Sequence, residues 1–230
     1  MQSAFAGTAT VISVAFAMAT YERWLRRRRR HELAWTGALA LFAVASAALL
    51  VGASVGWSGP TFRVFYLFGA VLNVPFLALG TLYLILGPER GDRWAAGICL
   101  GAAFSAGIVM VAPFTHAIPS HRLPQGSDVF GPAPRILAGA GSGAAALVVI
   151  GGALWSAYRV RRGKFVVSNL LIAFGTLITG ASGILNSVFD AMTAFAVTLV
   201  VGITVIFAGF LVATSAPARA RLSLVSEEAA

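Results

Sequence analysis

Asn73 is the polar residue best placed to do chemistry, because it stands about ten residues inside a long apolar stretch. A polar side chain at membrane depth costs free energy, and by default it marks a function or a contact between helices. Pro75 lacks an N–H, so a carbonyl group of its helix is left free and the helix is expected to kink. The pair predicts a helix that lines a ligand pocket, with a hydrogen bond from Asn73 to a neighbouring helix as the alternative.

A second polar face lies on a later apolar stretch and includes Asn169 and Thr176. At about 100° per residue, these two side chains share one broad face of a helix. We therefore expect them to continue the pocket of Asn73 and Pro75. The other explanation is that the hydroxyl groups bond to carbonyls of their own helix, which requires no partner.

Charged residues are expected at the outer ends of three helices. Asp190 is the only acid predicted near such an end, while Arg63 and Arg135 each open a helix. An ion pair between Asp190 and either arginine would satisfy the carboxylate in the low-dielectric interface. We interpret this pair as a structural latch, with a gate as the alternative.

His116, His121 and Asp128 lie near one another in a proline-rich stretch. Imidazole and carboxylate groups suit zinc, but a zinc site needs three or more ligands in a fixed geometry. A solvated loop is the preferred interpretation, and no metal or other cofactor is predicted. No set of acid, base and nucleophile can be assembled from the polar residues, so the sequence does not point to an enzyme.

The composition indicates that these residues sit in a membrane. The chain has 230 residues, of which 58% are hydrophobic and 11% charged, and a water-soluble domain does not easily accommodate that balance. The net charge of +9 could suggest nucleic acid. The basic residues nevertheless occur in short clusters between apolar runs, which is typical of membrane topology signals and argues against nucleic acid as a partner.

Seven apolar stretches reach the length of roughly 20 residues that a helix needs to cross the hydrocarbon core. The sequence therefore predicts an all-α, polytopic integral membrane protein, a single seven-helix domain over residues 1–214 with a short tail at 215–230. The stretches are continuous rather than alternating, which excludes barrel strands. A proline-rich outer loop is expected at 115–134, and the predicted helices cover about 3–21, 33–56, 64–87, 94–114, 136–158, 165–185 and 192–214.

The basic residues predict the orientation. With seven crossings, only Arg63, Arg122 and Arg135 of the 17 lysines and arginines fall on one side. The positive-inside rule then places the N-terminus outside and the C-terminus in the cytoplasm, in the cell's inner (plasma) membrane. The run Arg26 to Arg30 should attract anionic lipids at about 1 kcal/mol per charge.

An internal repeat is a further hypothesis. The first and fifth predicted helices end alike, in Tyr21 or Tyr158 followed by arginines, and residues 40–54 resemble residues 172–182. The pattern predicts two parallel triplets joined by a fourth helix, a three-plus-one-plus-three arrangement. The alternative is that alanine-rich membrane helices resemble one another by composition.

Two functional classes follow. The first is a sensor or accessory subunit of a membrane complex, without catalytic chemistry of its own. It would contact a membrane-protein partner or a second copy through its basic loops and its fourth helix. The second is a carrier or binding protein for a small neutral or lipophilic molecule, with a pocket near Asn73. The apolar stretches carry no charge near their middles, which argues against ion coupling.

Overall fold

The computed structural model describes residues 2–120, 122–160, 166–167, 170–179 and 192–214. Within these ranges the regular structure is helical, apart from one isolated antiparallel bridge between Phe114 and Phe130. The all-α prediction is confirmed. The helices are α1 (Gln2–Arg27), α2 (Arg30–Val55), α3 (Gly59–Phe65), α4 (Asn73–Leu86), α5 (Pro88–Val111), α6 (Gly126–Val129), α7 (Pro132–Ile136), α8 (Ser142–Val160) and α10 (Met192–Thr214), with π-helical segments η1 (Tyr66–Leu72) and η2 (Leu137–Gly141).

Five helical stretches in the described ranges are long and apolar enough to cross a membrane. These stretches are Ser3–Arg27, Arg30–Val55, Gly59–Leu86, Pro88–Val111 and Pro132–Ser156. Two shorter apolar segments, Leu170–Thr179 and Val197–Ile206, are also helical, the second of them inside α10. The chain therefore has the helices of a multi-pass membrane protein.

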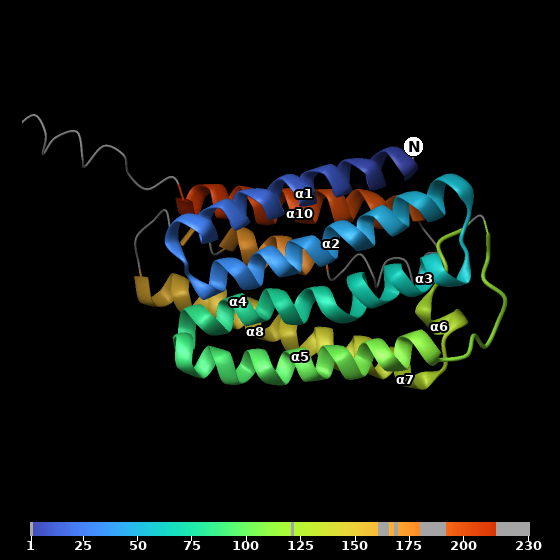
Figure 1. Ribbon diagram of the computed structural model, residues 1–230. Coiled ribbons are helices and arrows are strands. Elements are labelled where there is room, and N and C mark those ends of the chain that lie inside the picture. Colours follow the sequence, from blue (N-terminus) through green and yellow to red (C-terminus); the bar gives the residue numbers. More distant parts are fainter. Residues whose placement is uncertain (1, 121, 161–165, 168–169, 180–191, 215–230) are drawn as a thin grey trace, which may run out of the picture.

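The long helices lie side by side in a bundle (Figure 1). α1 packs against α2 and α10, and α4 packs against α2, α5 and α8. The turns after α1 and after α4 lie at one end of the bundle, here called the arginine end (residues 23–31 and 87–93). The α2–α3 turn and residues 112–120 and 122–131 lie at the opposite end, here called the loop end.

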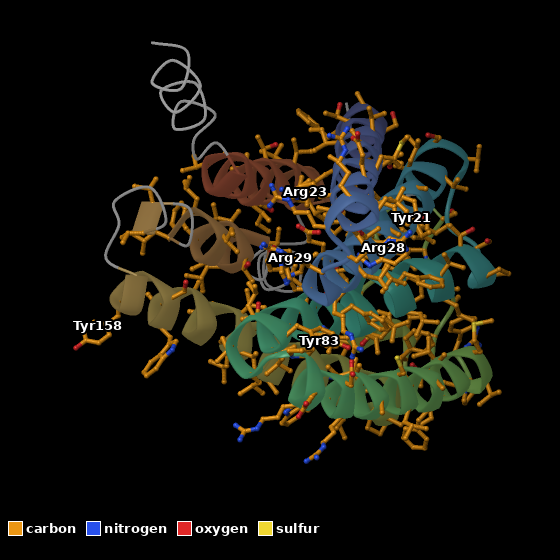
Figure 2. The ribbon with its side chains drawn as sticks, turned by 60° about the vertical axis from the view of Figure 1, so that its left-hand side comes forward. Tyr21, Arg23, Arg28, Arg29, Tyr83 and Tyr158 are labelled. Atoms are coloured by element: carbon orange, nitrogen blue, oxygen red, sulfur yellow. The ribbon has the colours of Figure 1, made fainter. Side chains whose placement is uncertain are left out.

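The arginine end differs from the prediction of a loop between residues 21 and 33. α1 continues to Arg27 and α2 begins at Arg30, so only two residues separate them. Arg28 has a φ of 53° and its N–H bonds to the carbonyl of Trp24, which ends α1 in the left-handed conformation. Arginine is a good helix former, so the helices continue beyond the apolar residues that the hydropathy argument counted. Figure 2 shows Arg23, Arg28 and Arg29 gathered where α1 and α2 meet.

The turns at the arginine end are joined by polar contacts. Arg30 forms an ion pair with Asp92, and the Tyr83 hydroxyl donates to Asp92 Oδ1 at 2.9 Å. The contacts link the α1–α2 turn to the first turns of α5. The α1–α2 turn and the α4–α5 turn therefore lie at the same end of the bundle. Two long helical stretches, α2 and Gly59–Leu86, separate these turns, so the chain runs the length of the bundle and back between them.

The proline-rich stretch at the loop end forms a structured cap. Phe130 is buried, and its ring lies 5.4 Å from Phe62, 5.0 Å from Tyr66 and 5.4 Å from Phe114. Gly126 lies directly above Tyr66, since a Cβ there would stand 2.4 Å from the ring. The segment between α5 and α7 is as long as the predicted loop at 115–134 but lies three residues earlier in the sequence. α5 already ends at Val111, and α7 already begins at Pro132, whose fixed φ suits the first helical turn.

The internal repeat predicted from the sequence, in which residues 172–182 resemble residues 40–54, is only partly covered by the described residues. Its second copy includes residues 180–182, which lie outside those ranges. The three-plus-one-plus-three arrangement therefore stays a prediction.

Candidate functional site: a cavity between the helices

A cavity of about 810 Å³ lies inside the bundle. Small-molecule sites have volumes of about 300–1,000 Å³, so this cavity has room for a drug-sized or lipid-sized molecule. Its described walls come from α2, from the end of α3 with η1 and α4, from α7 with η2 and α8, from the segment Leu170–Thr179 and from α10. Residues 123–127 of the loop-end cap complete the lining. Segments from both halves of the chain therefore enclose one space.

The two π-helical segments form adjacent parts of the wall. η1 and η2 contact one another, and Gly69, Ala70, Ala138 and Gly139 from them line the cavity. A π-helical turn holds one more residue per hydrogen-bonded ring than an α-helical turn, and such turns frequently occur at functional sites. Because these four side chains are small, the two segments come together without filling the space beside them.

Pro75 acts on this wall through the backbone and does not line the cavity, contrary to the prediction that it is a pocket residue. It has no N–H to offer to the carbonyls of Ala70 or Val71, five and four residues earlier. The Ser142 hydroxyl at the start of α8 donates to the Ala70 carbonyl at 2.5 Å. The proline therefore creates an acceptor inside the bundle, and Ser142 satisfies it while joining η1 to α8.

Asn73 lines the cavity and is half-buried. No hydrogen bond joins its side-chain amide to the described residues, which removes the contact with a neighbouring helix there as its explanation. Ser46 on α2 also lines the cavity, is 3% exposed, and has no hydrogen-bond partner in the same ranges. These two groups bring unused hydrogen-bonding capacity to a mostly apolar space.

Thr176 also lines the cavity, together with Thr179. The Thr176 hydroxyl donates to the Ile172 carbonyl at 2.8 Å, and that of Thr179 to the Gly175 carbonyl at 3.1 Å. The alternative explanation, a bond within their own helix, is therefore correct for both hydroxyls. Asn169 lies outside the described residues.

Arg135 lines the cavity at the loop end, with an exposed side chain. It is the one charged residue among the described lining residues. No carboxylate of the described ranges lies within ion-pair distance of its guanidinium. Nearby, the Tyr66 hydroxyl donates to the Pro134 carbonyl at 3.4 Å, which ties the base of α7 to η1.

Arg63 has a different environment. Its guanidinium donates to the carbonyl of Val109 and, at 2.7 Å, to that of Ala112, both at the C-terminal end of α5. It also lies 4.2 Å from the centre of the Phe114 ring. Asp190 lies outside the described residues, so the predicted latch stays a prediction, but the Arg63 side chain already has partners.

The proposed zinc ligands do not form a cluster in the part of the chain that the structure describes. His116 Nδ1 lies 2.8 Å from the main-chain oxygen of Asp128, and the Asp128 carboxylate accepts from Ser127 at 3.1 Å. His121 lies outside the described residues. No group of three or more His, Cys, Asp or Glu residues in those ranges could hold a metal ion.

Glu32 is a buried acid that the sequence argument missed. Its side chain is 5% exposed, and its Oε2 atom has no hydrogen-bond partner among the described residues. Arg23 on α1 is close enough to interact electrostatically with it. Nothing in the sequence indicated this burial, because Glu32 lies two residues after the arginine run and resembles a solvated loop residue. It does not line the cavity.

Comparison with known proteins gives no family for the chain. No protein-family model, no curated protein and no solved structure matches it.

Proposed function

We propose that the protein binds an elongated lipophilic molecule in the cavity between its helices, as a binding protein or carrier. The observation that carries the proposal is the half-buried Asn73 amide, which lies in the wall of a mostly apolar space of about 810 Å³ and has no hydrogen-bond partner among the described residues. A buried polar group without a partner costs free energy, and a ligand atom that pairs with it recovers that cost. Asn73 therefore favours a ligand that carries a hydrogen-bonding atom part-way along an apolar body.

The dimensions support an elongated ligand. On α2 the lining runs from Ala38 to Leu49, which at 1.5 Å per residue is a length of about 16 Å. One leaflet of a hydrocarbon core is about 15 Å thick, half of the usual 30 Å. A lipid-derived chain that is extended in one leaflet can thus lie along the cavity.

Methyl ricinoleate, a neutral acyl ester with a mid-chain hydroxyl, is a suitable first probe. Its equilibrium binding is measured on the purified chain in phosphatidylcholine nanodiscs, with binding to empty nanodiscs subtracted. Ser46→Leu places a larger side chain into the cavity and should remove the saturable binding. Val44→Leu, two residues away on the exposed side of α2, is the matched control and should bind normally. Equal binding by both variants would contradict the proposal.

We also propose the full topology of seven crossings in the cell's inner (plasma) membrane, with the N-terminus outside and the C-terminus in the cytoplasm. α10 has 23 residues, enough for one crossing, and residues 165–185 would supply another. The ion pair between Arg30 and Asp92 supports a common side for two basic turns. On that side Arg26 to Arg30 would contact anionic lipid headgroups.

Cysteine labelling tests this orientation. Cys99 is the single cysteine, so Cys99→Ser gives a background in which Arg29→Cys marks the arginine end and Ser120→Cys marks the loop end. A membrane-impermeant maleimide applied to intact cells should label Ser120→Cys and spare Arg29→Cys. The reverse result would invert the topology.

A role as sensor or accessory subunit is a second proposal, supported by the exposure of α5. Only 11% of its apolar window is buried inside the bundle, against 50% for α2. Leu100 and Phe104 are among its exposed side chains, and either lipid or a partner helix can cover them. A partner that co-purifies in mild detergent and is lost from Phe104→Ala would support this role. Repeated recovery of the chain alone would contradict it.

A further inference from the structure

We infer that the ligand of the cavity is an acid, whose anionic head binds at Arg135 while its apolar body extends toward Asn73. The inference rests on the proposed function and adds the chemical class of the ligand. Arg135 is the one charged residue in the described lining of the cavity, and no lining residue there is acidic. With a neutral molecule in the cavity, this guanidinium would have no anionic partner among the described residues.

The position of Arg135 suits an amphiphile. Its side chain is exposed at the loop end and also lines the cavity, so its guanidinium stands where the apolar space meets the water outside. An anionic head bound there keeps part of its hydration, and its chain enters the apolar space. The guanidinium presents parallel N–H groups that fit a carboxylate or a phosphate.

The other cation at this end has partners of its own. Arg63 donates to two carbonyls at the end of α5, and it does not line the cavity. Asp128 is the acid of the cap that lies closest to Arg135 in the sequence. Its carboxylate accepts a hydrogen bond from Ser127, and Asp128 does not line the cavity. The positive charge at the mouth of the cavity therefore comes from Arg135.

The experiment compares two ligands that differ only in the charge of the head. Ricinoleate and methyl ricinoleate share one chain and one hydroxyl, and their binding is measured in phosphatidylcholine nanodiscs at a pH that ionises the acid. The native chain should bind the acid about tenfold more tightly, the effect expected of one charge-assisted contact. Arg135→Gln should reduce this ratio to about one. Arg122→Gln, which removes an exposed loop-end charge outside the lining, should keep it.

The outcomes separate this inference from the proposed function. A native chain that binds acid and ester equally, or an Arg135→Gln variant that keeps the preference, would overturn the inference while leaving a Ser46-dependent site in place. Loss of Ser46 dependence for both ligands would remove the site itself. A second pair of ligands, oleyl phosphate and oleyl alcohol, identifies the source of the anion. If the preference for the phosphate over the alcohol exceeds the preference for ricinoleate over its methyl ester, the ligand is derived from a phospholipid.

Discussion

Arg63 and Arg135 stand at the loop end of the same bundle, and the sequence assigned both to one latch, yet their surroundings differ. Arg63 donates to carbonyls of Val109 and Ala112 and lies over the Phe114 ring. Arg135 lines a cavity, with no acidic partner among the described residues. The first arginine completes the fold, because a cation at a helix C-terminus satisfies otherwise orphaned carbonyls. The second has no acidic partner among the described residues, and we propose that its charge binds a ligand.

The same contrast recurs deeper in the bundle. Ser142 donates to the Ala70 carbonyl, whereas Asn73, three residues further along the same helical stretch as Ala70, has an amide without a described partner. Polar groups with partners should therefore govern stability, and polar groups without partners should govern binding. Four substitutions test this division.

The largest effect on stability is expected from Arg63→Gln. The change removes two charge-assisted hydrogen bonds to carbonyls and a cation–π contact, and we expect a loss of about 3 kcal/mol in the free energy of unfolding. Thermal unfolding in detergent, followed by tryptophan fluorescence, should show a midpoint lower by several degrees. Arg122→Gln is the control for loss of charge, and an equal effect in both variants would break the contrast.

A smaller loss is expected from Ser142→Ala. The Ala70 carbonyl would lose its donor inside the bundle, at a cost of about 1–3 kcal/mol. Thr8→Ala removes an exposed hydroxyl that bonds to its own helix at 2.9 Å, and it should leave the midpoint nearly unchanged. If Ser142→Ala were as stable as the Thr8 variant, the account of Pro75 and the π-helical wall would be wrong.

Asn73→Leu should act on binding and leave stability intact. Loss of one hydrogen bond should weaken binding of methyl ricinoleate about threefold to tenfold, because a net hydrogen bond contributes about 0.5–1.5 kcal/mol. Methyl oleate lacks the hydroxyl and is the control ligand, whose affinity should not fall. If the variant instead had a lower unfolding midpoint and unchanged affinities for both esters, Asn73 would stabilise the fold and would not bind the ligand.

Arg135→Gln should also change stability very little. An exposed cation without a described acidic partner contributes little to folding, so the change in free energy of unfolding should stay within about 0.5 kcal/mol. The thermal midpoint checks this directly. A loss comparable to that of Arg63→Gln would mean that Arg135 also holds the fold together.

The sequence predicted the apolar helices because the thickness of the hydrocarbon core fixes how long a run of apolar residues must be. It placed the helix ends poorly at the arginine end, since Arg27 and Arg30 remain helical beyond the hydrocarbon. The π-helical segments were not foreseen beyond the kink expected at Pro75. Their hydrogen-bond pattern depends on packing between η1 and η2, which no local pattern in the sequence records.

The candidate site was foreseen in part. Asn73 and Thr176 do line one space, because a polar residue inside an apolar run tends to face the bundle interior. The roles of Arg63 and Glu32 could not be read from the sequence. The partners of Arg63 are backbone carbonyls, which every residue has, and Glu32 is buried by tertiary packing next to a run of charges.

Photolabelling tests the central claim most directly. A fatty acid with a mid-chain diazirine is added to the chain in nanodiscs and irradiated, and the labelled peptides are identified by mass spectrometry. The account predicts saturable labelling on the cavity side of α2 and α8, between Ala38 and Leu49 and between Ser142 and Ala146, that ricinoleate competes away. Labelling confined to the exposed face of α5, around Leu100 and Phe104, and unaffected by ricinoleate would contradict it.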